Sequence, residues 1–269
     1  MSEDYHATPT IVVGIDGSRS AVEAALWAVD EAVCRDIPLR LLYAIDPTGS
    51  GPDGAARELA TAEIAVRYAF TAVESTEQPV KIEVEIVQGK PVHALTAASR
   101  SAVLICVGAA GLRNAIYGRV GSTAAAVASS AHCPVAVIRG HATSGCVLVE
   151  VDEWPTSSAA LQHGVDEARL RGVPLRVLTP VAAGGPMAQT QLGRRVAAWR
   201  RRYPDLDVQA VASQGSTLDY LAEHADSVQL VVVGAERTHG TGEIIGPPGV
   251  AALRATECSV LTCDRQRRL

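Results

Sequence analysis

The apolar positions along this chain alternate between short continuous runs and longer stretches with helical spacing. Residues 10–15 form a continuous apolar run, which is typical of a strand buried on both faces of a parallel sheet. Residues 20–35 instead place apolar side chains three or four positions apart, as an amphipathic helix does. Strands that alternate with helices predict right-handed crossovers and an open parallel sheet with helices on both faces.

This alternation continues through the first half of the chain. Further strands are predicted at residues 39–45, 80–87, 103–107 and 135–138, and further helices at residues 55–74, 91–100 and 123–131. Pro91 opens one of these helices at the position where proline is tolerated. The first half therefore predicts a complete α/β domain with an open five-stranded parallel sheet.

The second half of the chain repeats the first. The matches pair residues 29–32 with 165–168, residues 37–42 with 173–178, and residues 104–109 with 230–235. The offset falls from 136 to 126 residues along the chain, and such an ordered set of matches indicates an internal duplication. We expect two tandem domains, residues 1–142 and 143–269, that meet at a short polar stretch near residues 141–145.

The overall composition mainly excludes classes of partner. The net charge is −5 at pH 7, so no general attraction to nucleic acid or to anionic membranes is expected. No apolar stretch approaches the roughly 20 residues of a membrane span, and the polar N-terminus does not resemble a signal peptide. A cytoplasmic protein is therefore predicted, without a nucleic acid or membrane partner.

Two local features leave alternatives open. The six cysteines form no CxxC pair, which favours buried free thiols in a reducing compartment, with a Cys258–Cys263 disulfide as the alternative. The basic run at residues 194–202 is interpreted as the solvated end of a helix, with a docking patch for an acidic protein partner as the alternative.

The candidate chemistry follows two strands of the first half. The strand at 10–15 runs into Gly-Ile-Asp-Gly-Ser at residues 14–18, and the strand at 103–107 is followed by the pattern G-x2-G-x9-G-S, formed by Gly108, Gly111 and Gly121-Ser122. Glycines at a strand exit let the backbone approach a ligand closely. Gly121-Ser122 also precedes an Ala-rich helix, whose free N–H groups suit a phosphate chain. Ligands of open parallel sheets bind at such carboxyl ends, where the strand order reverses.

The glycine pattern, together with an aspartate after the first strand, resembles the ATP-binding universal stress protein domain. The resemblance covers the whole chain as two copies, the tandem form of that family. It implies two Rossmann-like domains of the adenine nucleotide alpha hydrolase type. It also implies an ATP-binding regulator or sensor in the stress response. The last strands, at 135–138 and 260–263, are expected to pair the two halves pseudo-symmetrically and to pair chains into a homodimer.

The resemblance assigns one group of residues to the adenosine part of the ligand. Asp16 is expected to hydrogen-bond the adenine edge, and Gly14 to let the base approach the first strand. The backbone of Ala44 is expected to read adenine, while Val107 and Gly108 contact the ribose. Without the glycine pattern, Asp16 would instead be interpreted as an Asx-turn residue or helix cap.

A second group is assigned to the phosphates, with Mg²⁺ as an optional companion ion. Its members, which would act mainly through backbone N–H groups, are Gly111, Gly121, Ser122 and Thr123. Arg113 and Arg119 lie in the intervening loop and would add positive charge, although the family pattern does not define their roles. Ser122 has the alternative role of a helix N-cap, which is compatible with ligand binding.

The second copy departs from the glycine pattern. Asp152 and Gly234 are retained, but Arg237 replaces the counterpart of Gly111 and Pro247 replaces that of Ser122. Proline removes a backbone N–H as well as the hydroxyl. We therefore predict one nucleotide per chain, held by the N-terminal domain.

The expected activity is binding without appreciable catalysis. The chain lacks a P-loop, and no general base is recognised near the phosphate loop, so slow ATP hydrolysis at most is predicted. One alternative is an ATP-dependent transferase or adenylating enzyme, although the S-G-G-x-D-S loop of the adenylating group is absent. The other is a scaffold that has lost its nucleotide. A regulatory protein partner is left unidentified.

Overall fold

A computed structural model describes most of the chain. The described residues are 9–46, 52–111, 121–140, 142, 144–151, 158–180, 186–213, 215–234, 242–246, 248–249, 253 and 256–263. Five residues named above lie outside these ranges, namely Arg113, Arg119, Asp152, Arg237 and Pro247. The predictions that rest on them are therefore not addressed by the structure.

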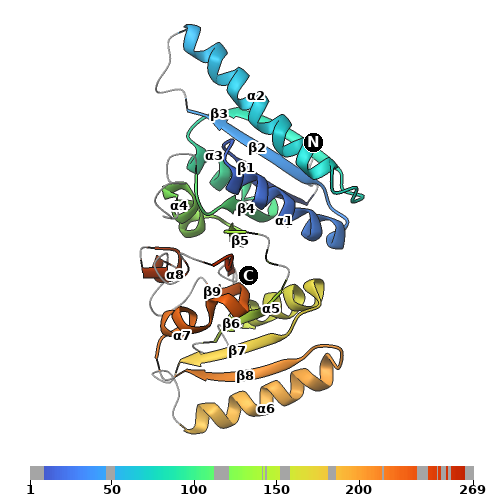
Figure 1. The fold of residues 1–269 in the computed structure, drawn as a ribbon, viewed down its shortest axis with the longest axis vertical. Helices are drawn as coiled ribbons and strands as arrows, with labels where there is room; N and C mark the ends of the chain where they lie inside the picture. The colour runs from blue at the N-terminus through green and yellow to red at the C-terminus, as the bar shows by residue number, and fades with distance from the viewer. Residues whose placement is uncertain are drawn as a thin grey trace, which may run out of the picture.

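The N-terminal half has the predicted alternation of strands and helices (Figure 1). Its elements are β1 (Thr10–Ile15), α1 (Arg19–Arg35), β2 (Leu39–Ile45), α2 (Pro52–Glu74), β3 (Ile82–Gln88), α3 (Pro91–Ala98), β4 (Ala102–Gly108), α4 (Ser122–Ser130) and β5 (Val135–Ile138). The predicted start of β3 at Val80 was two residues early, because the N–H of Val80 turns back to the carbonyl of Gln78 at 2.8 Å.

The C-terminal half repeats this order. Its elements are β6 (Cys146–Glu150), α5 (Ser158–Arg171), β7 (Leu175–Pro180), α6 (Pro186–Arg202), β8 (Val208–Ser213), α7 (Thr217–His224), a 3₁₀ turn (Ala225–Ser227), β9 (Val228–Gly234), α8 (Gly242–Ile245) and β10 (Ser259–Cys263). The basic run at 194–202 forms the end of α6, as the helix interpretation requires. The acidic-partner alternative stays open.

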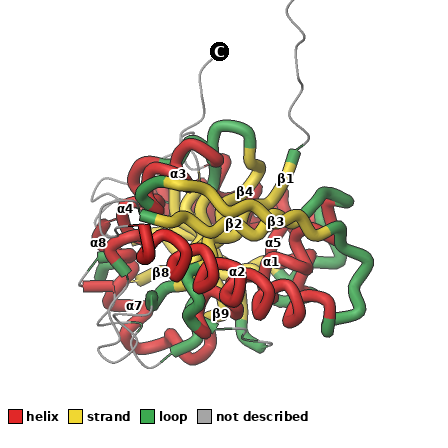
Figure 2. The backbone as a smooth tube through the Cα atoms, turned by 90° about the horizontal axis from the view of Figure 1, so that it is seen from above, coloured by secondary structure: helices red, strands yellow, loops and turns green. Residues whose placement is uncertain are grey.

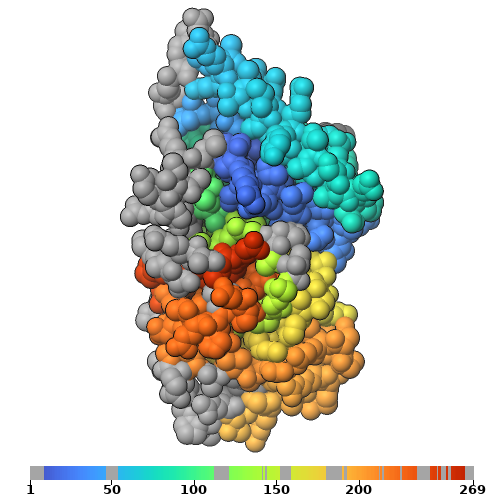
Figure 3. Space-filling view, viewed as in Figure 1, coloured from blue at the N-terminus to red at the C-terminus, as the bar shows by residue number. Residues whose placement is uncertain are grey.

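The strands form one sheet of ten, in the order β3-β2-β1-β4-β5-β10-β9-β6-β7-β8. Within each half all pairs are parallel, which confirms the predicted α/β class. The two five-stranded sheets are joined by an antiparallel pair, in which Leu261 of β10 lies opposite Ala136 of β5. Figure 3 shows the halves stacked along the long axis of the molecule, with the C-terminal strand region between them.

This pairing within the chain corrects the predicted homodimer interface. β5 lies between β4 and β10, and β10 lies between β5 and β9, so neither last strand has a free edge. The predicted pairing of the two halves through these strands is confirmed, whereas a second chain cannot add a strand there, so the predicted homodimerisation through the same strands is wrong. The outer strands of the sheet are β3 and β8. Dimerisation by another surface stays a prediction.

Helices cover both faces of the sheet (Figure 2). One core packs α1, α2, α5 and α6 against the sheet, and a second core packs α3, α4, α7 and α8 against the opposite face. Cys263 belongs to the first core and Cys258 to the second. Because Cys263 packs into one core and Cys258, just before β10, into the core on the opposite face, the alternative of a disulfide between them is excluded.

The duplication extends to the ends of helices α1 and α5. Asp36 ends α1 with a left-handed φ of 51°, and Gly172 ends α5 with φ 64°. The N–H of the next residue then bonds back into the helix in both copies, from Ile37 to Ala32 at 3.1 Å and from Val173 to Ala168 at 3.0 Å. Such left-handed C-caps satisfy the last carbonyl groups of a helix.

A buried cluster of four charged residues joins the two halves. Glu31 and Arg35 on α1 meet their counterparts Glu167 and Arg171 on α5, at the same offset of 136 residues. Arg35 lies 2.7 Å from Glu31 and 3.6 Å from Glu167, while Arg171 lies 2.9 Å from Glu31 and also pairs with Glu167. The Arg171 guanidinium stacks 4.6 Å from the Trp27 ring centroid. We call this group the charge clasp.

Candidate functional site

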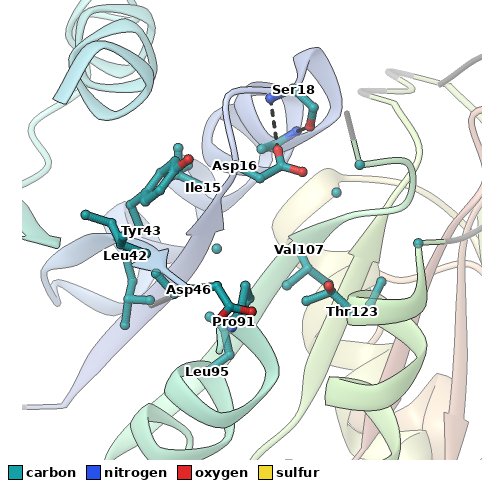
Figure 4. Close-up of a pocket in the computed structure, with 18 of the residues that line it drawn as sticks. Ile15, Asp16, Ser18, Leu42, Tyr43, Asp46, Pro91, Leu95, Val107 and Thr123 are labelled. Carbon is teal, nitrogen blue, oxygen red and sulfur yellow. Dashed lines mark hydrogen bonds between the residues drawn. The ribbon is translucent and has the colours of Figure 1, made fainter. Parts of the chain in front are cut away.

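A cavity of about 620 Å³ opens at the carboxyl ends of β1, β2 and β4. Its volume lies within the range of roughly 300–1,000 Å³ that is usual for small-molecule sites. β1 lies between β2 and β4 in the sheet, so the cavity is at the point where the strand order reverses. Figure 4 shows side chains from β1, β2, α3, β4 and α4 directed around it.

The cavity brings together nine of the ten residues assigned to nucleotide binding. They are Gly14, Asp16, Ala44, Val107, Gly108, Gly111, Gly121, Ser122 and Thr123. The tenth, Arg113, lies outside the described residues. The structure thus places the two motifs beside each other, whereas the contacts assigned to each residue stay predictions.

Asp16 has a structural role and also faces the cavity. Its Oδ1 accepts the N–H of Ser18 at 2.9 Å, which is the Asx-turn considered from the sequence. Ser18 in turn caps α1 by accepting the N–H of Ala21 at 3.1 Å. The second oxygen, Oδ2, faces Gly111, where a Cβ would lie 3.0 Å from it. The hydrogen bond to Ser18 (Figure 4) therefore holds Asp16 so that its other oxygen lies beside Gly111.

Gly108 has a reason for being glycine that the sequence did not reveal. A Cβ at this position would lie 2.6 Å from the carbonyl carbon of Ser20, at the start of α1. The Ser20 hydroxyl also accepts the N–H of Ala110 at 3.3 Å and donates to the Ile138 carbonyl at 3.4 Å. Close packing of α1 against the ends of β4 and β5 therefore requires this glycine, independently of any ligand.

The start of α4 differs in detail from the expectation. Gly121, not Ser122, is the N-cap, and no side chain caps the helix. The Gly121 N–H donates to the Ala109 carbonyl at 2.8 Å, so it is not free for a phosphate as predicted. Residues 122–124 follow as the first helical turn, whose N–H groups have no partner inside a helix. Ser122 is exposed at the cavity.

Apolar side chains that carry no sequence motif line another part of the cavity. Leu42 of β2, Leu95 of α3 and Val107 of β4 are each nearly buried. A Cβ on Gly14 would lie 3.1 Å from the Leu95 side chain and 3.3 Å from that of Val107. Gly14 therefore keeps open the space between these side chains, which suits the flat apolar face of a base.

Acidic and phenolic groups also line the cavity, and sequence analysis missed them. Tyr43 and Asp46 come from β2 and its end, and Glu58 comes from α2. Burial raises the pKa of Tyr43, and the nearby carboxylates of Asp16 and Glu58 raise it further. Among the described lining residues there is no lysine or arginine. Carboxylates are thus present in this cavity, although the sequence suggested no candidate base.

Other classes of site have less support in the described part of the chain. No described helix is both long enough and apolar enough to cross a membrane. The described histidine, cysteine, aspartate and glutamate side chains form no group of three or more that would hold a metal ion. The cavity at the sheet's switch point is therefore the candidate site that fold and geometry define.

Comparisons with known proteins identify the family of this doubly wound α/β protein. The model of the universal stress protein family matches residues 8–139. Universal stress protein Rv2028c of Mycobacterium tuberculosis is 49% identical over 273 residues, covering 97% of this chain and 98% of the relative. Universal stress protein Rv3134c of the same organism is 45% identical, covering 93% and 97%. The chain therefore belongs to the universal stress protein family.

A solved structure shows the same fold over the full length. The universal stress protein from Archaeoglobus fulgidus superposes with a TM-score of 0.77 and covers 98% of this chain and 99% of that one. Sequence identity is 17%, so this likeness concerns the fold alone. It extends across both halves of the ten-stranded sheet.

Proposed function

We propose that the N-terminal half binds ATP in the cavity at the ends of β1, β2 and β4, and that the protein acts as a nucleotide-dependent regulator in the stress response. We take the two domains to be residues 1–142, with the nucleotide site, and residues 143–269. The observation that carries it is the convergence of Asp16, the glycine loop and the uncapped start of α4 on one cavity of suitable size. Membership of the universal stress protein family supports the same ligand class.

The residues present fit an adenine nucleotide. Leu42, Leu95 and Val107 offer apolar contact for the base beside Gly14. Ala44 would read the base edge through its backbone. The first turn of α4 offers N–H groups at a positive helix end, which is a favourable arrangement for phosphate. The protein would therefore hold the base and the phosphates at opposite sides of the glycine loop.

The acidic lining makes the proposed affinity dependent on added positive charge. Asp16, Asp46 and Glu58 would repel a triphosphate, because like charges in a partly desolvated site destabilise each other. Mg²⁺ bound with ATP would neutralise part of this charge, as would arginines from the loop at 112–120. Binding of ATP is therefore expected to be tighter with Mg²⁺ than with a chelator.

Hydrolysis is proposed to be slow. The expected role of nucleotide is that of a ligand, and rates below about 1 s⁻¹ would lie under the range usual for enzymes. Asp46 and Glu58 are the carboxylates to examine if faster turnover is observed, since both line the cavity. Loss of such turnover in Asp46→Asn or Glu58→Gln would indicate that the protein is an ATP-hydrolysing enzyme.

Two variants at Gly121 test the binding site. A Cβ there would meet only the Gly111 nitrogen at 3.6 Å and the Ala109 oxygen at 3.9 Å, which are ordinary contacts, so Gly121→Ala is expected to fold and bind ATP normally. Gly121→Glu adds a carboxylate beside the phosphate position. If this carboxylate keeps the phosphates from two N–H groups at the start of α4, two charged hydrogen bonds of about 1.5–3 kcal/mol each are lost. The affinity for ATP then falls by roughly two to four decades.

Calorimetry with Mg-ATP on the wild type and both variants is the measurement. Unchanged affinity in Gly121→Glu would show that the nucleotide binds elsewhere. Heat-released supernatant of the purified protein should also contain an adenine nucleotide. Its absence, together with no heat of binding in the wild type, would instead support a scaffold without nucleotide.

A further inference from the structure

The repeated sheet gives each strand position of the cavity a counterpart in the C-terminal half. In the first copy Gly14 of β1 lies opposite Leu42 of β2. In the second copy Glu150 of β6 lies opposite Leu178 of β7. Glu150 therefore occupies the position of Gly14, the glycine that keeps the cavity open.

The surroundings of Glu150 correspond to the apolar wall of the cavity. A side chain on Gly14 would enter the space beside Leu95 and Val107. The counterparts of those residues are Leu221 and Val233, and both are 0% exposed. Glu150 itself is only 3% exposed. The space that is open in the N-terminal half is therefore filled by the protein's own side chain in the C-terminal half.

A second position, on the neighbouring strand, also differs between the copies in a way that disfavours binding of a base. Ala44 of β2 lies opposite Val87 of β3, and Pro180 of β7 lies opposite Ser213 of β8 in the corresponding register. Proline has no backbone N–H. The strand edge at which the first copy would donate a hydrogen bond to a base has therefore lost its donor in the second copy.

A buried carboxylate is also chemically unsuited to adenine nucleotides. Burying a charged group is costly unless it is compensated, and Glu150 makes an interaction within the protein. An incoming base would have to displace this carboxylate and disrupt that interaction. The phosphates would meet a further negative charge.

We propose that Glu150 closes the second base site, so that the chain binds nucleotide only in its N-terminal half. This inference rests on the proposed function for that half. It uses residues of β6, β7, α7 and β9, and is therefore independent of the loop substitutions Arg237 and Pro247.

Equilibrium dialysis on the full chain, with Mg-ATP and separately with adenosine, tests the proposal. Wild type should bind one equivalent of either ligand. Gly14→Glu transfers the closing side chain to the first site and should reduce binding there by at least about 100-fold, by excluding the base and adding a buried charge. Gly193→Glu on α6 is the matched control, because it adds the same carboxylate at an exposed position where a Cβ meets no described atom within 4 Å, and it should bind as wild type does.

The reverse change supplies a test that does not depend on the folding of Gly14→Glu. The double variant Glu150→Gly with Pro180→Ala should bind a second adenosine, a probe without phosphates that does not use the altered loop. Two equivalents bound to wild type, or retained binding in folded Gly14→Glu, would overturn the proposal. So would a double variant that folds and still binds one. No binding at all to wild type would instead refute the proposed function of the N-terminal half.

Discussion

Gly14 and Glu150 occupy the same strand position in two copies of one fold, and the two copies differ there in what fills the space above the sheet. In the first copy the space is part of a cavity of about 620 Å³. In the second copy the corresponding residue is a glutamate that is 3% exposed. Under the proposed closure of the second site, the parallel sheet and its helices are retained while the ligand site at their edge is lost, because the two depend on different residues.

The charge clasp is the contact through which the stability of each half is expected to depend most on the other half. Arg171 contacts both glutamates and Trp27 and is 12% exposed, whereas Arg35 is 28% exposed. Removing one partner of a buried ion pair typically costs about 3–5 kcal/mol, because the remaining charges stay buried. Arg171→Ala is therefore expected to lower the free energy of unfolding by about that amount.

Arg35→Ala is the matched control for this prediction, since it removes the counterpart from the other half. Because Arg35 is more exposed and Arg171 still pairs with both glutamates, a smaller loss than for Arg171→Ala is expected. Urea denaturation of both variants measures the difference. Equal effects would show that the two halves contribute symmetrically to the clasp.

A glycine pair provides a smaller effect with a direct internal control. A Cβ on Gly108 would overlap the backbone of Ser20, while a Cβ on its counterpart Gly234 meets no described atom within 4 Å. Overpacking of this kind costs about 1–3 kcal/mol. Gly108→Ala should therefore be destabilised by that amount, and Gly234→Ala should change stability by less than about 0.5 kcal/mol. Thermal unfolding with equal losses in both variants would contradict the packing argument.

The smallest expected effect of the charge clasp is on the pH dependence of stability. Burial, followed by the Glu31 carboxylate, raises the pKa of Glu167 to about 8, against the lowering effect of Arg171 and Arg35. The folded state then holds a proton that the unfolded state has released, so this contribution is present at low pH and is lost as pH rises through about 8.

Above pH 6.5 the melting temperature should thus fall until about pH 8 and then level off, by about 2–4 °C for each kcal/mol lost. Glu167→Gln should flatten that decline. His163 also lies near Arg35, but burial lowers its pKa, so its titration falls below this window. Burial raises the pKa of Cys106 well above the usual value, and the Glu31 and Glu167 carboxylates raise it further. An unchanged slope in Glu167→Gln would assign the decline to other groups.

Most secondary structure and much of the cavity lining were predictable from local sequence. Hydrophobic periodicity located the strands of the first half, since a buried strand and an amphipathic helix repeat at different intervals. The glycine pattern located the loop that lines the cavity, because glycine at a strand exit permits close approach. By contrast, Tyr43, Asp46 and Glu58 carry no motif, and they reach the cavity only because β2 and α2 pack beside β1.

By itself, the sequence determined the two copies, the order of their elements and the presence of a glycine loop after β4, because these are encoded in spacing along the chain. Only the tertiary structure decided that β5 and β10 join the copies into one sheet, that Gly108 serves the packing of α1, and that Glu31 and Glu167 face each other. Each of these depends on which surfaces meet across more than 80 residues of chain. Periodicity shows which face of an element is buried, but it does not specify what that face is buried against.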